Sequence, residues 1–270
     1  MDDKQKEYND LIKKFKKRCE KWNKNAAENK QKLKVVYNED LDGKNISEIQ
    51  YIIVADNPGE KEWENKVYLF DSRDDKKRAG YIAHETFRRL KLDEKMFLVL
   101  NKTPIFTPKS ENLNKYNESP ILQESMEYMA ELTFNINKIN SSIQTIVFGI
   151  GDCFDSDKEK FDDGELFSAY YKKIAELYLS SEGEKPRFPI IVKHFSRYSF
   201  LQDFCVEKEK PTNLKLCENK LKFDDIKKVS LKDFEKGINL LPYSKWLKKY
   251  GKSMVDGKTT TGKSRIKKKG

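Results

Sequence analysis

The sequence predicts an α/β protein of three αβα layers, with a central, mostly parallel four-stranded sheet and helices on both faces. Short runs of β-branched, aromatic and aliphatic residues alternate with longer amphipathic segments, and this alternation is typical of parallel sheets. The chain has 270 residues, 37% of them hydrophobic, which is enough to bury the core of one such domain. The expected strands cover residues 51–54, 97–100, 145–149 and 188–193.

The expected helices precede the first strand and separate the others. Apolar side chains recur at nearly helical spacing from Leu11 to Trp22, with lysines between them, and predict a helix over residues 8–29. Similar patterns predict helices over 80–91, 119–137 and 161–179, with Pro120 in a first turn. Residues 34–37 form either a short strand or an extended lead-in.

The chain is organised as one domain followed by a basic tail. We expect a single domain over residues 1–250, comprising the N-terminal helix, a core over 50–205 and a lysine-rich segment over 206–250. Residues 251–270 form a basic tail that we expect to be flexible. The net charge of +10 lies mostly at the two ends, since residues 245–270 hold ten basic residues and one acid. Positively charged ends can bind the phosphate backbone of nucleic acid. An equally good interpretation is that these lysines only form solvated surfaces.

Composition excludes some classes of protein. Charged residues make up 36% of the chain, and no apolar run approaches the ~20 residues that a membrane-spanning helix needs. The charged start of the sequence does not resemble a signal peptide. Four scattered cysteines have no metal-type spacing, so we expect reduced thiols. We therefore expect a cytoplasmic monomer, associated with the nucleoid, or nuclear in a eukaryote.

Three of the predicted strands end in polar side chains suited to chemistry. Asp56 and Asn57 follow the first strand, Asn101 ends the second, and His194 follows the fourth. Because the carboxyl ends of parallel strands share one edge, these residues are expected to meet in one pocket. The plainer alternatives are turn-forming Asp and Asn residues and a partly buried, satisfied imidazole.

These strand ends carry a resemblance to a known family. The chain resembles the uracil-DNA glycosylase superfamily over roughly residues 50–205, in four segments. ADNPGEKE at 55–62 is similar to the water-activating loop of the Asn-Pro-Gly and Glu-Ala-Pro-Gly members, and VYLFDSRDDKKRAG at 67–80 to the segment that supplies a stacking ring. LVLNKTPIFT at 98–107 resembles the base-reading strand, and KHFSRYSF at 193–200 resembles the His-Pro-Ser loop.

The resemblance implies a DNA repair hydrolase that cleaves the N-glycosidic bond of uracil, or of a related damaged pyrimidine, flipped out of DNA. Such cleavage expels a base anion and leaves an oxocarbenium-like sugar for water to attack. The resemblance gives His194 the role of donor to the base O2. It makes Asn57 or Asp56 the group that holds the water, with Asn57 preferred.

Base recognition and DNA contact are also implied by the resemblance. The amide of Asn101 would donate to uracil O4 and accept from N3–H, a pattern that mispairs with cytosine. Phe70, or failing that Tyr68, would stack on the flipped base, whose extrusion costs a few kcal/mol. A second group of residues would contact the DNA: Ser196 a flanking phosphate, and Arg197 or Tyr198 the gap left in the duplex.

Some residues depart from the family pattern. Gly59 stands where strict uracil enzymes place a tyrosine, which leaves the exclusion of thymine open. Ala55 replaces a usual glycine, and Phe195 replaces the proline of His-Pro-Ser. Because of the altered His loop, the alternative is a catalytically silent member of the same fold that binds nucleic acid or a partner. We expect no iron–sulfur cluster, no other cofactor and no metal, and uracil-containing DNA as the partner.

Two further patterns favour ordinary structure. GKTTTGKS at 257–264 matches the phosphate-loop pattern in full, but only six residues follow it, too few for the helix that such a loop requires. An acidic cluster at 155–165 lacks the glycine of a calcium loop and is expected to be a solvated loop.

Overall fold

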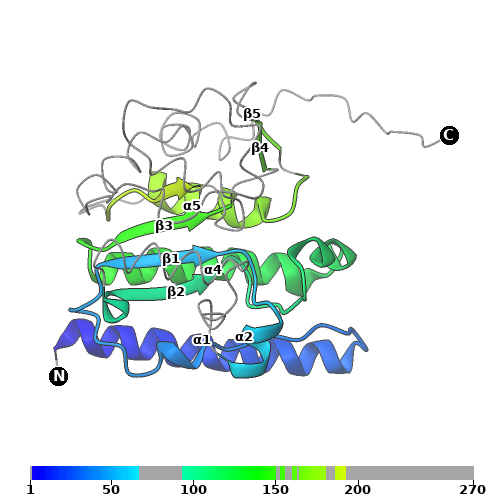
Figure 1. Cartoon of the computed structure of the whole chain (residues 1–270), viewed down its shortest axis with the longest axis horizontal. Helices are drawn as coiled ribbons and strands as arrows, with labels where there is room; N and C mark the ends of the chain where they lie inside the picture. The colour runs from blue at the N-terminus through cyan, green and yellow to red at the C-terminus, as the bar shows by residue number, and fades with distance from the viewer. Residues whose placement is uncertain are drawn as a thin grey trace, which may run out of the picture.

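A four-stranded, all-parallel sheet organises the protein. The computed structural model describes residues 2–66, 93–149, 153–155, 160–162, 164–180 and 186–192. The strands are β1 (Tyr51–Ala55), β2 (Phe97–Asn101), β3 (Gln144–Phe148) and β6 (Ile190–Val192), in the order β2-β1-β3-β6 (Figure 1). The predicted α/β class with a four-stranded parallel sheet is therefore confirmed.

The strand register divides the sheet residues between two buried faces. Ile52 pairs with Leu98, and Val54 pairs with Leu100 and Val147, so these side chains share one face because side chains alternate along a strand. Ile53 lies on the other face and has no exposed surface. Both faces are thus shielded from water, as a parallel sheet in a three-layer fold requires.

Three long helices pack with the face that carries Ile52 and Val54. They are α1 (Asp3–Glu28), α4 (Pro120–Ile139) and α5 (Ser168–Ser180), and α4 contacts both of the others. Their buried side chains join one hydrophobic cluster with the sheet. Pro120 stands in the first turn of α4, where its missing N–H has no intrahelical partner to lose. The described helices contain no segment long and apolar enough to cross a membrane.

Several predicted boundaries are wrong by a few residues. The N-terminal helix begins at Asp3 rather than at residue 8, because polar residues before the apolar stripe still form helix behind an Asp2 cap. The helix predicted over 161–179 begins only at Ser168, and the short strands β4 (Phe154–Asp155) and β5 (Lys160–Phe161) pair before it. Near residues 34–37 only an isolated antiparallel bridge forms, between Val35 and Ile105.

The remaining described elements are short. They are α2 (Glu60–Asn65) and three 3₁₀ turns at Glu39–Leu41, Glu94–Met96 and Ser110–Tyr116. The predicted helix over 80–91 and the segments 206–250 and 251–270, which include the pattern at 257–264, lie outside the described residues.

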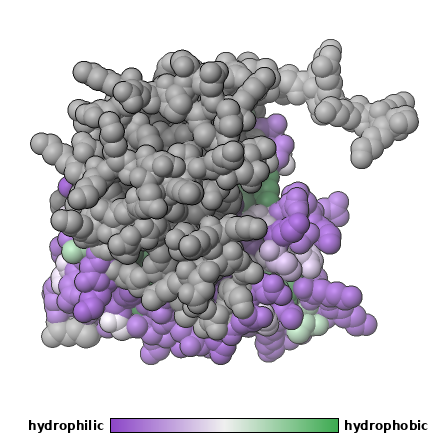
Figure 2. All heavy atoms as spheres, in the orientation of Figure 1, coloured by the Kyte–Doolittle hydropathy of each residue, from purple (hydrophilic) through white to green (hydrophobic). Residues whose placement is uncertain are grey.

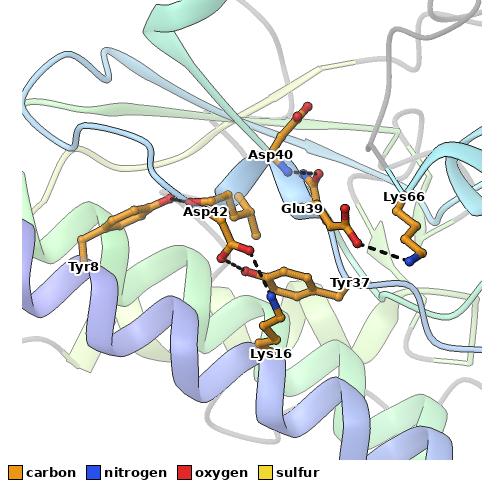
Figure 3. A network of polar contacts seen from close by, with 9 residues as sticks. Tyr8, Lys16, Tyr37, Glu39, Asp40, Asp42 and Lys66 are labelled. Atoms are coloured by element: carbon orange, nitrogen blue, oxygen red, sulfur yellow. Dashed lines mark hydrogen bonds and ion pairs between the residues drawn. The ribbon is translucent and has the colours of Figure 1, made fainter.

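A polar network fixes α1 to the connection that leads into β1 (Figure 3). Asp42 accepts a hydrogen bond from the Tyr37 hydroxyl at 2.6 Å and pairs with Lys16 of α1 at 3.1 Å. The Tyr8 hydroxyl donates to the carbonyl of Leu41 at 2.9 Å. These contacts hold the connection against α1. β1 begins nine residues after Asp42.

This network predicts an acid-sensitive contribution to stability. Burial raises the pKa of Asp42, but hydrogen bonds from Tyr37 and Lys16 and the charge of Lys16 outweigh it, so the pKa is lowered from 3.8. A carboxyl whose pKa is lower in the folded state stabilises the fold above its unfolded pKa, and that contribution disappears as pH falls through the folded pKa. We therefore expect Asp42→Asn to lower the thermal midpoint at pH 6 and to have progressively less effect as the pH falls below 3.8. Calorimetry over a series of pH values checks this, and a loss that does not shrink with falling pH would contradict it.

Candidate functional site

The carboxyl edge of the sheet brings the predicted residues of β1 and β2 together. The two strands are direct neighbours, and Ala55 at the end of β1 pairs with Asn101 at the end of β2. Asp56 and Asn57 therefore leave β1 beside Asn101. The fourth strand, β6, lies on the far side of β3. Its carboxyl end reaches the same edge, and His194 comes two residues after it, outside the described residues.

Asn101 has a buried oxygen without a hydrogen-bond donor. Its side chain is 1% exposed, and no described residue donates to Oδ1. Strand alternation points this side chain away from the face packed with α4, because Asn101 follows the parity of Phe97 and Val99. An unsatisfied buried acceptor costs roughly 1–3 kcal/mol. A ligand that offers an N–H there would remove this cost.

Asn57 is held in a fixed orientation by the loop that follows β2. Its Nδ2 donates to Thr107 Oγ1 at 2.9 Å and to the Pro58 carbonyl at 3.0 Å. Longer contacts of 3.4 Å reach the carbonyls of Ile105 and Thr107. With the amide nitrogen engaged, the amide oxygen is the group left to accept from water, and no described residue donates to it.

Asp56 is committed to an ion pair with Lys102, a residue that the sequence reading did not single out. The Lys102 side chain is fully buried, whereas that of Asp56 is 19% exposed. The lysine Nζ donates to Asp56 Oδ1 and to the Gly149 carbonyl at 3.1 Å. Its backbone N–H also donates to the carbonyls of Ala55 and Asp56, at 2.8 and 2.9 Å. Lys102 therefore ties together the chain segments that follow β1, β2 and β3.

Two aromatic rings of the α5 region complete the surroundings of the buried ammonium. Lys102 Nζ lies 4.7 Å from the ring centroid of Phe167 and 5.3 Å from that of Tyr171. Phe167 has a φ of 70°, which is strained for a bulky residue. Cation–π attraction of about 2 kcal/mol or more is available to a desolvated ammonium. The only sequence signal for this arrangement was a lysine directly after a strand, in the segment LNKTP.

The loop after β2 is anchored to α4 as well. The hydroxyls of Thr103 and Ser125 lie 2.6 Å apart, and both side chains are buried. Ser125 in turn donates to the carbonyl of Leu122 at 2.8 Å. This anchor holds the loop whose later residues contact Asn57.

Gly59 begins α2 directly after the Asn57 loop. Its N–H donates to Glu62 Oε2 at 3.1 Å, which caps the helix. A Cβ at this position would lie 2.9 Å from the same oxygen. That oxygen lies at the end of a flexible side chain and can shift, so the capping contact does not by itself require glycine here.

The other predicted site residues lie outside the described part of the chain: His194, Phe70, Tyr68, Ser196, Arg197 and Tyr198. Comparisons with models of protein families, with curated proteins and with solved structures found no match. The resemblance to uracil-DNA glycosylases therefore remains a prediction from the sequence.

Proposed function

We propose that this protein hydrolyses the N-glycosidic bond of uracil, or of a related damaged pyrimidine, in DNA and leaves an abasic site. The observation that carries the proposal is the buried, unpartnered Oδ1 of Asn101 at the carboxyl edge of the sheet. Uracil presents an N3–H donor, which this oxygen would accept. Cytosine has no hydrogen on N3, so the acceptor would stay unsatisfied and cytosine would be disfavoured.

Asn57 is the better candidate for holding the attacking water. The contacts to Thr107 and Pro58 use its amide nitrogen and fix the plane of the amide, which leaves the oxygen to orient water. Asp56 is less suited to that role because Lys102 neutralises its carboxylate. In this reading the Asp56–Lys102 pair fixes the backbone immediately before Asn57.

A catalytically silent nucleic-acid-binding protein of the same fold is the second candidate. The observation that favours it is the same ion pair, which removes a carboxylate from the chemistry. The two candidates differ in one product, since only the enzyme leaves an abasic site that alkali converts into a strand break.

The test is an oligonucleotide carrying one uracil, incubated with the protein and then with alkali. We expect cleavage by the wild type, and a loss of about 10²-fold in Asn57→Ala and in Asn101→Ala, which remove water positioning and base recognition. Asn114→Ala is the matched control, because Asn114 is an exposed asparagine in the 3₁₀ turn at Ser110–Tyr116 and, among the described residues, forms no hydrogen bond with Asn57 or Asn101. His194→Ala tests the donor to the base O2.

The outcomes separate the candidates. Binding without cleavage by the wild type supports the silent protein. Cleavage that survives in both Asn57→Ala and Asn101→Ala would contradict the site. A wild-type protein that neither binds nor cleaves the oligonucleotide would contradict both functions. Matched oligonucleotides with a thymine mismatch, hypoxanthine or xanthine in place of uracil define the base that is excised.

A further inference from the structure

An exposed aromatic pair, Trp63 and Phe106, lies beside the candidate site. Trp63 in α2 is 37% exposed, and it is the one exposed large hydrophobic side chain among the described residues. Its ring stacks on that of the half-buried Phe106, with centroids 5.3 Å apart and planes inclined by 27°. Two rings stacked at the surface offer a flat apolar platform, which is the shape that a nucleobase fits.

Backbone contacts place the aromatic pair close to Asn57. The residue after Phe106, Thr107, accepts the hydrogen bond from Asn57 Nδ2 at 2.9 Å. The Thr107 N–H donates to the Pro58 carbonyl at 3.3 Å. In Figure 1, α2 lies between the arrowhead end of β1 and the second half of α1. A nucleic-acid strand with a base bound to the aromatic pair would thus pass close to Asn57.

A lysine completes this surface. Lys34 is exposed, and its Nζ lies 4.7 Å from the centroid of the Trp63 ring. The Lys34 carbonyl accepts from the Phe106 N–H at 2.8 Å, so the backbone of this lysine is fixed to the pair. An exposed cation–π contact is worth about 0.5–1 kcal/mol, whereas base–aromatic stacking is worth about 1–3 kcal/mol. An arriving base therefore displaces the ammonium, which is then free to bind a phosphate.

Positive charge extends from this surface along α1. Residues 13–34 hold ten basic residues and two acids. Exposed lysines recur at helical spacing on the face of α1 that does not enter the core, and more follow the helix: Lys13, Lys17, Lys21, Lys24, Lys30 and Lys32. Hydrophilic residues cover much of the lower edge of the molecule, where α1 runs (Figure 2). Because the opposite face of α1 is buried in the core, the helix presents charge without apolar side chains to insert into a membrane.

We infer that Trp63, Phe106 and Lys34 form a docking surface for single-stranded nucleic acid, with a base on the rings and the backbone directed along the lysines of α1. Exposed acids on α2, Glu60 and Glu64, disfavour phosphates over that helix and leave the ring surface for a base. Bases in a duplex are already stacked, so an unpaired strand is the better ligand. This inference extends the proposed function by assigning where the strand is held, and it requires no cleavage.

The test uses a fluorescently labelled 12-nucleotide oligo(dT) that contains no uracil, so that binding is measured without excision. We expect Trp63→Ala to raise the Kd by about 5- to 100-fold, and Trp63→Phe, which keeps a ring, to stay within about threefold. Lys34→Ala should reduce the slope of log Kd against log salt by about 0.7. Lys95→Ala is the matched control, because Lys95 is exposed and precedes β2 at the opposite edge of the sheet.

Tryptophan fluorescence gives a second readout. The wild-type signal minus that of Trp63→Phe isolates Trp63 from the other two tryptophans of the chain. This difference signal should be quenched as oligo(dT) is added. The inference is overturned if Trp63→Ala binds as the wild type does, if the quench is absent, or if a matched duplex binds more tightly. Binding to anionic phosphatidylserine vesicles that requires Trp63, in place of oligonucleotide binding, would also overturn it.

An oligo(rU) of the same length tests whether the preferred ligand is RNA or DNA. Whichever of the two binds more tightly, binding that depends on Trp63 supports the docking surface. Failure of the glycosylase proposal has a different signature. In that case oligo(dT) still binds through Trp63, and only the abasic product from the uracil oligonucleotide is missing.

Discussion

Replacing Lys102 by methionine is expected to lower the free energy of unfolding by about 3 kcal/mol. Removing one partner of a buried ion pair costs roughly 3–5 kcal/mol, because the other charge is left uncompensated. The low end applies because Lys102 is fully buried but the Asp56 side chain is 19% exposed and keeps some contact with water. Methionine fits beside the rings of Phe167 and Tyr171 but cannot donate to the Gly149 carbonyl. Denaturant unfolding measures the loss.

Two further variants test the cause. Lys109→Met removes one partner of an exposed pair with Glu111, whose side chains are 74% and 71% exposed, so it should change stability by less than about 1 kcal/mol. The double variant Asp56→Asn with Lys102→Met leaves no unpaired charge and should recover part of the loss. If the double variant is as unstable as Lys102→Met, the ion pair is not the source of the effect.

Replacing Trp22 by alanine is expected to cost about 4 kcal/mol, the largest loss among the substitutions proposed. Truncating a fully buried tryptophan removes its apolar contacts and leaves a cavity, at a typical cost of about 3–5 kcal/mol. Trp22 has no exposed surface, and its ring meets that of Tyr128 of α4 edge-on, with centroids 5.5 Å apart. The substitution therefore weakens the attachment of α1 to α4. Thermal and denaturant unfolding both measure it.

Trp22→Phe is the informative companion to that substitution. The indole Nε1 is buried and has no acceptor among the described residues. Phenylalanine loses some packing area but also removes this unsatisfied N–H, whose burial costs about 1–3 kcal/mol. We expect the two effects to cancel to within about 1 kcal/mol. A loss in Trp22→Phe as large as in Trp22→Ala would show that the indole N–H has a partner in solution.

The elements that the sequence predicted well are those governed by local patterns. The strands at 51–54 and 97–100 are runs of apolar residues, all buried except the half-buried Val99, and each lies within a strand of the structure. The apolar stripe from Leu11 to Trp22 placed α1, since helical spacing depends only on near neighbours. The start of α5 was mispredicted, because residues 160–161 pair with 154–155 and not with their own next turn.

The sequence by itself determined which polar residues end β1 and β2, and that parallel strands would bring Asp56, Asn57 and Asn101 to one edge. Only the tertiary structure decided which of their polar atoms other residues already engage and which have no partner among the described residues. The burial of Lys102 beneath α5, its pairing with Asp56 and the hold of Thr107 on Asn57 join residues up to 69 positions apart. Contacts between such distant residues arise when helices pack on the sheet, and no local spacing in the chain encodes them.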